Sequence, residues 1–172
     1  MKTRLTTVDI KALVNDFQSL ISMRLNNVYD SDNNKGIILK LNRTGEKQML
    51  LIESGVRIHT IQGDFSVFRQ MPTSFASKLR KHLKNKRLEK VDQIGTDRII
   101  RFQFGMGEYI NYLICEFYAN GNIILTDVDY KMLSKIRYHI YDENNKFTYP
   151  IQWFNLNLDS NKLDSIDSDK FN

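Results

Sequence analysis

Short turn sequences divide the second half of this chain into segments of strand length. The turns are Gly95-Thr96-Asp97, Gly105-Met106-Gly107 and Asn120-Gly121, which are rich in the residues that tight hairpin connections favour. Between and beside them lie apolar runs at residues 87–94, 98–104, 108–118 and 122–127. Because short connections join neighbouring antiparallel strands, the pattern predicts an antiparallel sheet whose third segment can also carry a helical turn.

The first half of the chain combines two helix patterns with further strand patterns. Residues 6–21 repeat apolar side chains at helical spacing behind Thr6-Thr7, and residues 74–84 form a second amphipathic run. Strand patterns occupy residues 24–29, 36–41, 48–53 and 56–61, and an edge or hairpin strand is expected at residues 131–140. The order of helix, strands, helix and strands predicts an α+β fold of mostly antiparallel sheets, or a β-sandwich, flanked by helices.

Charge is distributed unevenly along the 172 residues, which carry +5 overall. The last 18 residues are rich in Asn, Asp and Ser, and they hold four aspartates and two lysines, so removing their net −2 leaves +7. We therefore expect a folded domain over residues 1–154 and an acidic linker or tail over residues 155–172. A basic excess of this size suits a polyanion or an anionic membrane surface.

Several classes of protein and site lack support in the sequence. No apolar run reaches the roughly 20 residues that cross a bilayer, and the N-terminus lacks the apolar stretch of a secretory signal. Cys115 stands alone in an apolar run and is expected to be a buried small hydrophobe. His59, His82 and His139 lie far from other ligand-type residues, and no phosphate-binding loop or nucleophile motif occurs. We expect a soluble intracellular protein with no metal, no cofactor and no membrane partner.

The most informative local pattern is the basic segment, residues 78–90, which holds seven Lys or Arg against a single acid, Glu89. At helical spacing the apolar face comprises Phe75, Ala76, Leu79 and Leu83, and the cationic face comprises Lys78, Arg80, Lys81 and Lys84. Like charges three or four residues apart repel, so bound phosphates would stabilise the helix. Taken alone, a charge run is more often a solvated helix face, and that alternative stays open here.

The pair Asp97-Arg98 stands at a turn immediately before an apolar strand pattern. One interpretation is structural, with Asp97 capping the turn and Arg98 forming an ion pair. The other is functional: Arg98 offers a planar guanidinium to a phosphate or a base edge, and Asp97 holds it in place. The residues alone do not choose between these interpretations.

Seven sequence blocks, in order and without large gaps from Met1 to about Tyr141, resemble the NFACT N-terminal domain. They begin with the run from Ile10 onward and continue with MRLNNVYD at residues 23–30, LIESGVRIHT at 51–60, MPTSFA at 71–76, LRKHLK at 79–84, TDRII at 96–100 and GNIILTD at 121–127. That domain begins the nuclear export mediator factor of animals, its yeast counterpart in the ribosome quality control complex, and bacterial RqcH or fibronectin-binding-protein-like relatives. The blocks resemble the eukaryotic branch more closely.

The resemblance implies a non-enzymatic role in the rescue of stalled translation, in the cytoplasm and also in the nucleus. Family members bind the large ribosomal subunit that carries peptidyl-tRNA, engage tRNA, and support mRNA-free addition of residues to the nascent chain's C-terminus, called CAT tailing. In eukaryotes the full-length protein also recruits the E3 ligase Listerin. The family's residues for tRNA engagement and tailing match Asp9, Asp97 and Arg98 here, and peptide-bond chemistry belongs to the ribosome.

The family's fold also resembles the N-terminal domain of formamidopyrimidine-DNA glycosylases. Those enzymes use an N-terminal proline followed by a glutamate, whereas here Met1 is followed by Lys2 and Thr3. Glycosylase activity is therefore rejected, because a shared fold does not carry a shared function. Complete family members continue into further regions, so this chain is either an excised part of a longer protein or a natural truncation, and we expect the former.

These inferences assign a role to each residue of the expected tRNA- and RNA-binding site. Sequence-independent phosphate contacts are expected from Arg80, Lys81, Lys84, Lys86 and Arg87. A more specific contact is expected from Arg98, positioned by Asp97, while Asp9 either orients a base or caps its helix. The alternative function is a protein-interaction module without direct RNA contact, in which the cationic face is solvated.

Overall fold

A computed structural model describes residues 4–31, 35–62, 71–118, 120–137 and Tyr149, which form two antiparallel sheets and two α-helices. The first sheet has the order β1 (Arg24–Asp30), β2 (Gly36–Arg43), β3 (Glu46–Glu53) and β4 (Arg57–Ile61). The second has the order β5 (Leu88–Gln93), β6 (Ile99–Phe104), β7 (Asn111–Glu116), β8 (Asn122–Thr126) and β9 (Met132–Lys135). Within each sheet the strands therefore pair in the order of the sequence, as the short turns predict, and of the consecutive strands only β4 and β5 are not paired with each other.

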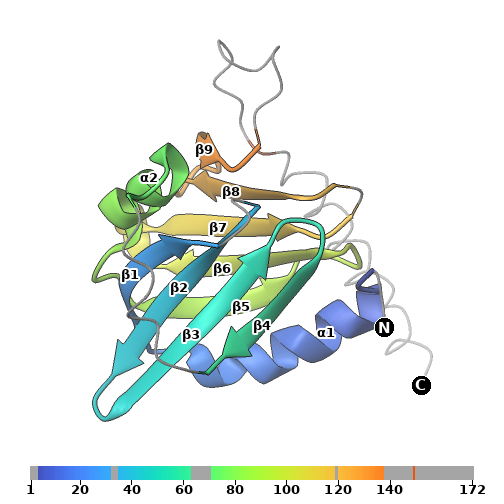
Figure 1. The fold of residues 1–172 in the computed structure, drawn as a ribbon, viewed down its shortest axis with the longest axis horizontal. Helices are drawn as coiled ribbons and strands as arrows, with labels where there is room; N and C mark the ends of the chain where they lie inside the picture. The colour runs from blue at the N-terminus through green and yellow to red at the C-terminus, as the bar shows by residue number, and fades with distance from the viewer. Residues whose placement is uncertain (1–3, 32–34, 63–70, 119, 138–148, 150–172) are drawn as a thin grey trace, which may run out of the picture.

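The two sheets lie face to face, and the strands of the first run obliquely in front of those of the second (Figure 1). Alternate side chains of both sheets point into the layer between them, where Leu39 and Leu41 of β2 and Phe102 and Phe104 of β6 are fully buried. The core is thus shared by both sheets, and it supplies the hydrophobic stabilisation that holds them together.

Two helices close the sides of this sandwich. Helix α1 (Thr7–Asp16), continued by the 3₁₀ turn η1 (Phe17–Leu20), lies along β5, where the side-chain amide of Gln18 donates to the Val91 carbonyl at 2.9 Å. Helix α2 (Ser74–Leu83) lies against β1 and β9. Its start is fixed because the Asp30 carboxylate accepts from the Thr73 hydroxyl at 2.6 Å and from the Thr73 amide at 2.8 Å.

The chain that follows α2 is joined to the start of β1 by backbone hydrogen bonds between residues 22–25 and residues 85–88, which we call the seam. The Ser22 amide donates to the Leu88 carbonyl and the Leu88 amide to the Met23 carbonyl, each at 2.8 Å. The Leu25 amide donates to the Lys86 carbonyl at 3.0 Å, and the Asn85 amide to the Leu25 carbonyl at 2.8 Å. The seam therefore links the first sheet to the second and fixes the end of α2.

The opposite end of the sandwich is closed by a contact between two turns. Gly55, after β3, lies against Asn120 and Gly121, which connect β7 to β8. The Ser54 hydroxyl donates to the Asn120 carbonyl at 3.2 Å across the same contact. Both glycines have positive φ, 72° and 66°, so this close approach requires residues without a Cβ.

The predicted fold class is confirmed, and most predicted elements agree to within two residues. The segment at residues 108–118 carries the helical turn that its sequence allows, since η2 (Gly107–Tyr109) precedes β7. The main difference is at residues 131–140, where the strand β9 ends at Lys135. Cys115 is buried, as expected, and burial raises the pKa of its thiol. Residues 138–140 of the last predicted strand and the predicted linker at 155–172 lie outside the described residues. No helix within the described part of the chain is long and apolar enough to cross a membrane.

The contact between turns gives a stability prediction with a matched control. A Cβ at Gly121 would overlap the backbone nitrogen of Gly55 and lie 2.5 Å from the Glu116 carbonyl oxygen, whereas one at Gly45, where φ is also positive at 75°, would meet nothing within 4 Å. We expect Gly121→Ala to lower the free energy of unfolding by at least about 2 kcal/mol and Gly45→Ala by about 1 kcal/mol, the backbone strain alone. Urea unfolding measures both; equal losses would contradict the close contact.

Candidate nucleic-acid interface

Helix α2 presents the two faces that its sequence predicts. Phe75, Ala76, Leu79 and Leu83 are buried in the core between the sheets. Lys78 and Lys81 on the helix and Lys84 at its C-cap are exposed. The amphipathic prediction is therefore confirmed, and the apolar face of the helix is occupied by its own core.

Three lysines of the basic segment have ammonium groups without a partner in the described part of the chain. Lys78, Lys81 and Lys84 make no hydrogen bond or ion pair with another described residue, and they follow one another at intervals of three. Residues at this spacing are neighbours on a helix surface, so their charges add along one line. Two of the cations of the basic segment also stabilise the helix, since Arg80 and Lys81 lie in its last turn, where positive charge complements the helix dipole.

Arg80 and Lys86 differ from these lysines because their side chains are half-buried and bonded within the fold. The Arg80 guanidinium donates to the Val28 carbonyl at 2.7 Å and lies 5.7 Å from the ring centre of Tyr29. The Lys86 ammonium donates to the Tyr109 carbonyl at 2.6 Å and to the Asn111 side-chain oxygen. Burial lowers the pKa of Lys86. Both side chains are therefore bonded within the fold, and they are less available to phosphates than the sequence predicts.

The remaining cations of the basic segment are exposed but have acids near them. Arg87 lies 3.9 Å from the Glu89 carboxylate, and Lys90 lies 3.7 Å from that of Asp92. Such surface pairs contribute at most about 1 kcal/mol, so both cations remain available to a polyanion. Arg24, which was not predicted from the sequence, is a further exposed cation beside Arg87. Its backbone pairs with that of Arg87 in an isolated β-bridge, and its side chain donates to the Asn85 carbonyl at 3.0 Å.

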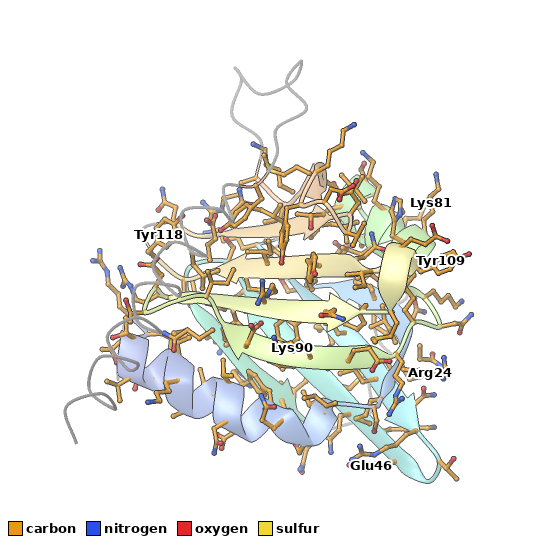
Figure 2. All side chains as sticks on the ribbon, turned by 180° about the vertical axis from the view of Figure 1, so that it is seen from behind. Arg24, Glu46, Lys81, Lys90, Tyr109 and Tyr118 are labelled. Atoms are coloured by element: carbon orange, nitrogen blue, oxygen red, sulfur yellow. The ribbon has the colours of Figure 1, made fainter. Side chains whose placement is uncertain are left out.

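The basic segment and the Asp97-Arg98 pair lie at opposite ends of β5. Arg87 immediately precedes this strand, whereas Asp97 lies in the turn beyond it, so the six residues of β5 separate them by roughly 20 Å. In Figure 2, Lys81, Arg24 and Tyr109 stand at one end of the molecule and Tyr118 at the other. Closeness in sequence therefore does not make these two regions one surface.

No ion pair joins Asp97 to Arg98 within the described residues, so the expectation that Asp97 holds the Arg98 guanidinium in place finds no contact to support it. Asp97 is exposed, and its backbone closes the turn: its amide donates to the Ile94 carbonyl at 3.2 Å, and its carbonyl accepts from the Gln93 side chain at 2.8 Å. The Arg98 side chain is half-buried, while its carbonyl accepts from the Phe117 amide at 2.8 Å. The sequence missed the nearby Tyr118, whose pKa is raised by burial and by the Glu116 carboxylate that its hydroxyl contacts.

Asp9 caps its helix. Its carboxylate accepts from the Thr6 amide at 2.9 Å, and its amide donates to the Thr6 hydroxyl at 3.1 Å, which forms a capping box. Residues 22–23 bond to Leu88, and Gln18 bonds to Val91, so α1 runs antiparallel to β5. The start of α1 and the β5–β6 turn consequently lie at the same end of the molecule (Figure 1). Asp9 thus shares an end with Asp97 and Arg98.

Comparison with known proteins identifies this architecture. Residues 6–152 match the family model described as "NFACT N-terminal and middle domains". The mouse ribosome quality control complex subunit NEMF is 48% identical over 139 residues, covering 80% of this chain and 13% of that protein. Its Drosophila melanogaster homolog is 46% identical over 158 residues, covering 88% of this chain and 16% of that protein. The chain therefore spans about an eighth to a sixth of these relatives, and the predicted similarity to the eukaryotic branch is confirmed.

A solved structure supports the fold. The crystal structure of the N-terminal domain of the fibronectin-binding protein PavA from Streptococcus pneumoniae superposes with a TM-score of 0.71 at 22% identity. The match covers 84% of this chain and 58% of that one. At this identity the likeness establishes the shared fold alone.

The lysines around α2 give a pH-dependent prediction. Partial burial and the charges of Lys81, Lys86 and Lys78 lower the pKa of His82 below its ordinary value of 6.5. The unfolded chain therefore binds more protons than the folded chain, and stability falls as the pH drops below about 6.5. We expect His82→Gln to flatten the dependence of the urea midpoint on pH between about 5 and 6.5. Lys81→Ala should flatten it in part; equal slopes in all three proteins would contradict this coupling.

Proposed function

Because the chain belongs to the NFACT N-terminal family, we propose that it is an RNA-binding module of a ribosome-associated quality control factor. In this role it holds tRNA on a large ribosomal subunit that carries peptidyl-tRNA, and so supports rescue of the stalled nascent chain and its C-terminal tailing. A role in ribosome quality control is supported by the names of the relatives, which are ribosome quality control complex subunits. RNA as the ligand is supported by the positive charge of the surface.

The observation that carries the RNA-binding proposal is the line of ammonium groups at Lys78, Lys81 and Lys84. No carboxylate among the described residues neutralises them, and the helix that bears them is fixed at its start by Asp30 and at its end by the seam. A fixed cationic line attracts the phosphates of a nucleic acid and releases the counterions condensed on them. Arg87 and Arg24 extend the cationic surface beyond the helix.

The basic segment and Arg98 lie apart, and we expect them to contribute differently to RNA binding. Contacts from the basic segment are to phosphates and carry no base selection, whereas Arg98 has a planar donor group suited to a base edge or a single phosphate. Because roughly 20 Å of β5 lies between them, a short oligonucleotide on α2 does not reach Arg98, and a folded RNA as large as tRNA does. Asp9 contributes at the Arg98 end through its helix cap.

We propose that this module binds RNA and catalyses no reaction, and that it acts in the cytoplasm and also in the nucleus. Recruitment of the E3 ligase Listerin is assigned to the full-length protein; this chain matches only 13% to 16% of the length of these relatives. Weak binding by the isolated chain is expected, because other regions and the ribosome add to the overall affinity.

Salt titration of tRNA binding tests the proposal. The logarithm of the association constant should fall with the logarithm of salt concentration, by about 0.7 to 0.9 for each phosphate contacted. We expect Lys81→Ala and Lys84→Ala to flatten this slope by about one each, because each removes a phosphate contact. The matched control is Lys47→Ala, an exposed lysine on β3 beside the β2–β3 turn, which should leave the slope unchanged.

A folded chain that binds tRNA without salt dependence, or with equal slopes in all three variants, would contradict the proposal. In that case the chain is better described as a protein-interaction module. Affinity capture with and without nuclease separates the two, because protein partners of such a module remain bound after RNA is destroyed.

A further inference from the structure

The loop between β6 and β7 is anchored to the basic segment at two points. The Gly105 amide donates to the Arg87 carbonyl at 3.0 Å, and the Lys86 ammonium donates to the Tyr109 carbonyl at 2.6 Å. Gly105 has φ of 81°, and a Cβ there would lie 2.8 Å from the Tyr109 carbonyl oxygen. The turn η2 completes the loop with a bond from the Tyr109 amide to the Met106 carbonyl at 3.2 Å. The backbone of Tyr109 is therefore held in place.

The side chain of Tyr109, by contrast, is 71% exposed. Among the described residues its ring has no stacking partner and its hydroxyl no hydrogen bond. Two neighbouring tyrosines behave differently: Tyr112 and Tyr130 stack at 4.4 Å with an interplanar angle of 2°, and the Tyr130 hydroxyl accepts from Arg101 at 2.7 Å. Those two rings thus have partners within the fold, whereas the ring of Tyr109 faces solvent.

Tyr109 stands among the cations of the proposed RNA surface. Figure 2 shows it at the same end of the molecule as Lys81 and Arg24, and its carbonyl contacts Lys86 directly. Glu108 in the same turn is exposed and carries the opposite charge. Tyr118, the other exposed tyrosine in the described part of the chain, is 41% exposed, and its hydroxyl contacts Glu116 at the far end. An exposed aromatic ring amid exposed cations is therefore specific to the basic end within the described residues.

We infer that Tyr109 is a stacking platform for an unpaired nucleobase of the RNA whose phosphates contact the basic segment. The inference rests on the proposed function and adds a ligand feature, an unstacked base, that phosphate contacts do not require. Proteins that bind single-stranded nucleic acid combine a cationic track with exposed aromatic rings, because every base offers a π-face to a ring. A fixed backbone helps, since the ring then loses little freedom on binding.

The test compares two RNAs and four proteins. The RNAs are a hairpin with an unpaired loop and a blunt duplex with the same stem sequence; the proteins are the wild-type chain, Tyr109→Ala, Tyr109→Phe and the control Glu108→Ala. Stacking on one base contributes roughly five- to hundredfold in affinity, so we expect Tyr109→Ala to weaken hairpin binding about tenfold. Duplex affinity should not change, Tyr109→Phe should bind as wild type, and Glu108→Ala should bind at least as tightly.

The salt dependence distinguishes this inference from the proposed function. Stacking releases no counterions, so Tyr109→Ala should keep the wild-type slope while losing affinity. A wild-type chain that binds neither RNA in a salt-dependent way would overturn the proposed function itself. If the wild type binds both RNAs and Tyr109→Ala retains full affinity for the hairpin, or loses affinity equally for the duplex, the stacking role alone is wrong.

Discussion

The backbone hydrogen bonds of the seam determine where the cationic surface lies. They join residues 22–25 at the start of β1 to residues 85–88 after α2, and they include bonds to the carbonyls of Leu88 and Lys86. Asn85 takes a positive φ of 69° at this point, so the chain turns sharply out of the helix and into β5. As a result the end of α2, the anchored turn at Tyr109 and Arg24 are held together, although they come from three distant parts of the sequence.

The sandwich itself acts as a spacer between two ends of different chemistry. One end carries an exposed tyrosine and lysines that have no partner among the described residues. The other end carries Asp9, Asp97, Arg98 and a tyrosine bonded to a carboxylate. Because the core between the sheets is closely packed, the distance between the ends is fixed. A rigid separation of this kind suits a ligand that is large and folded, which is the kind of ligand that we propose.

Local patterns predicted the elements well, and non-local contacts explain what they missed. The apolar stripe of α2 was correctly placed because helical periodicity depends only on neighbouring residues. The inward bonds of Arg80 and Lys86 were not foreseen, since their acceptors at Val28 and Tyr109 lie 52 and 23 residues away. Likewise, Arg87 and Asp97 are ten positions apart in sequence, and the intervening strand carries them to opposite ends.

Photo-crosslinking of tRNA to the chain, read out by mass spectrometry, is the most direct test of binding at the two ends, because it reports which residues touch RNA. If tRNA spans the two ends, we expect crosslinks on the basic segment around Lys81 and Lys84 and on the peptide that contains Arg98, with none on the β2–β3 turn near Lys47. A short oligonucleotide should crosslink to the basic segment alone. Crosslinks confined to other surfaces, or found on the β2–β3 turn as often as on α2, would contradict RNA binding by these two ends.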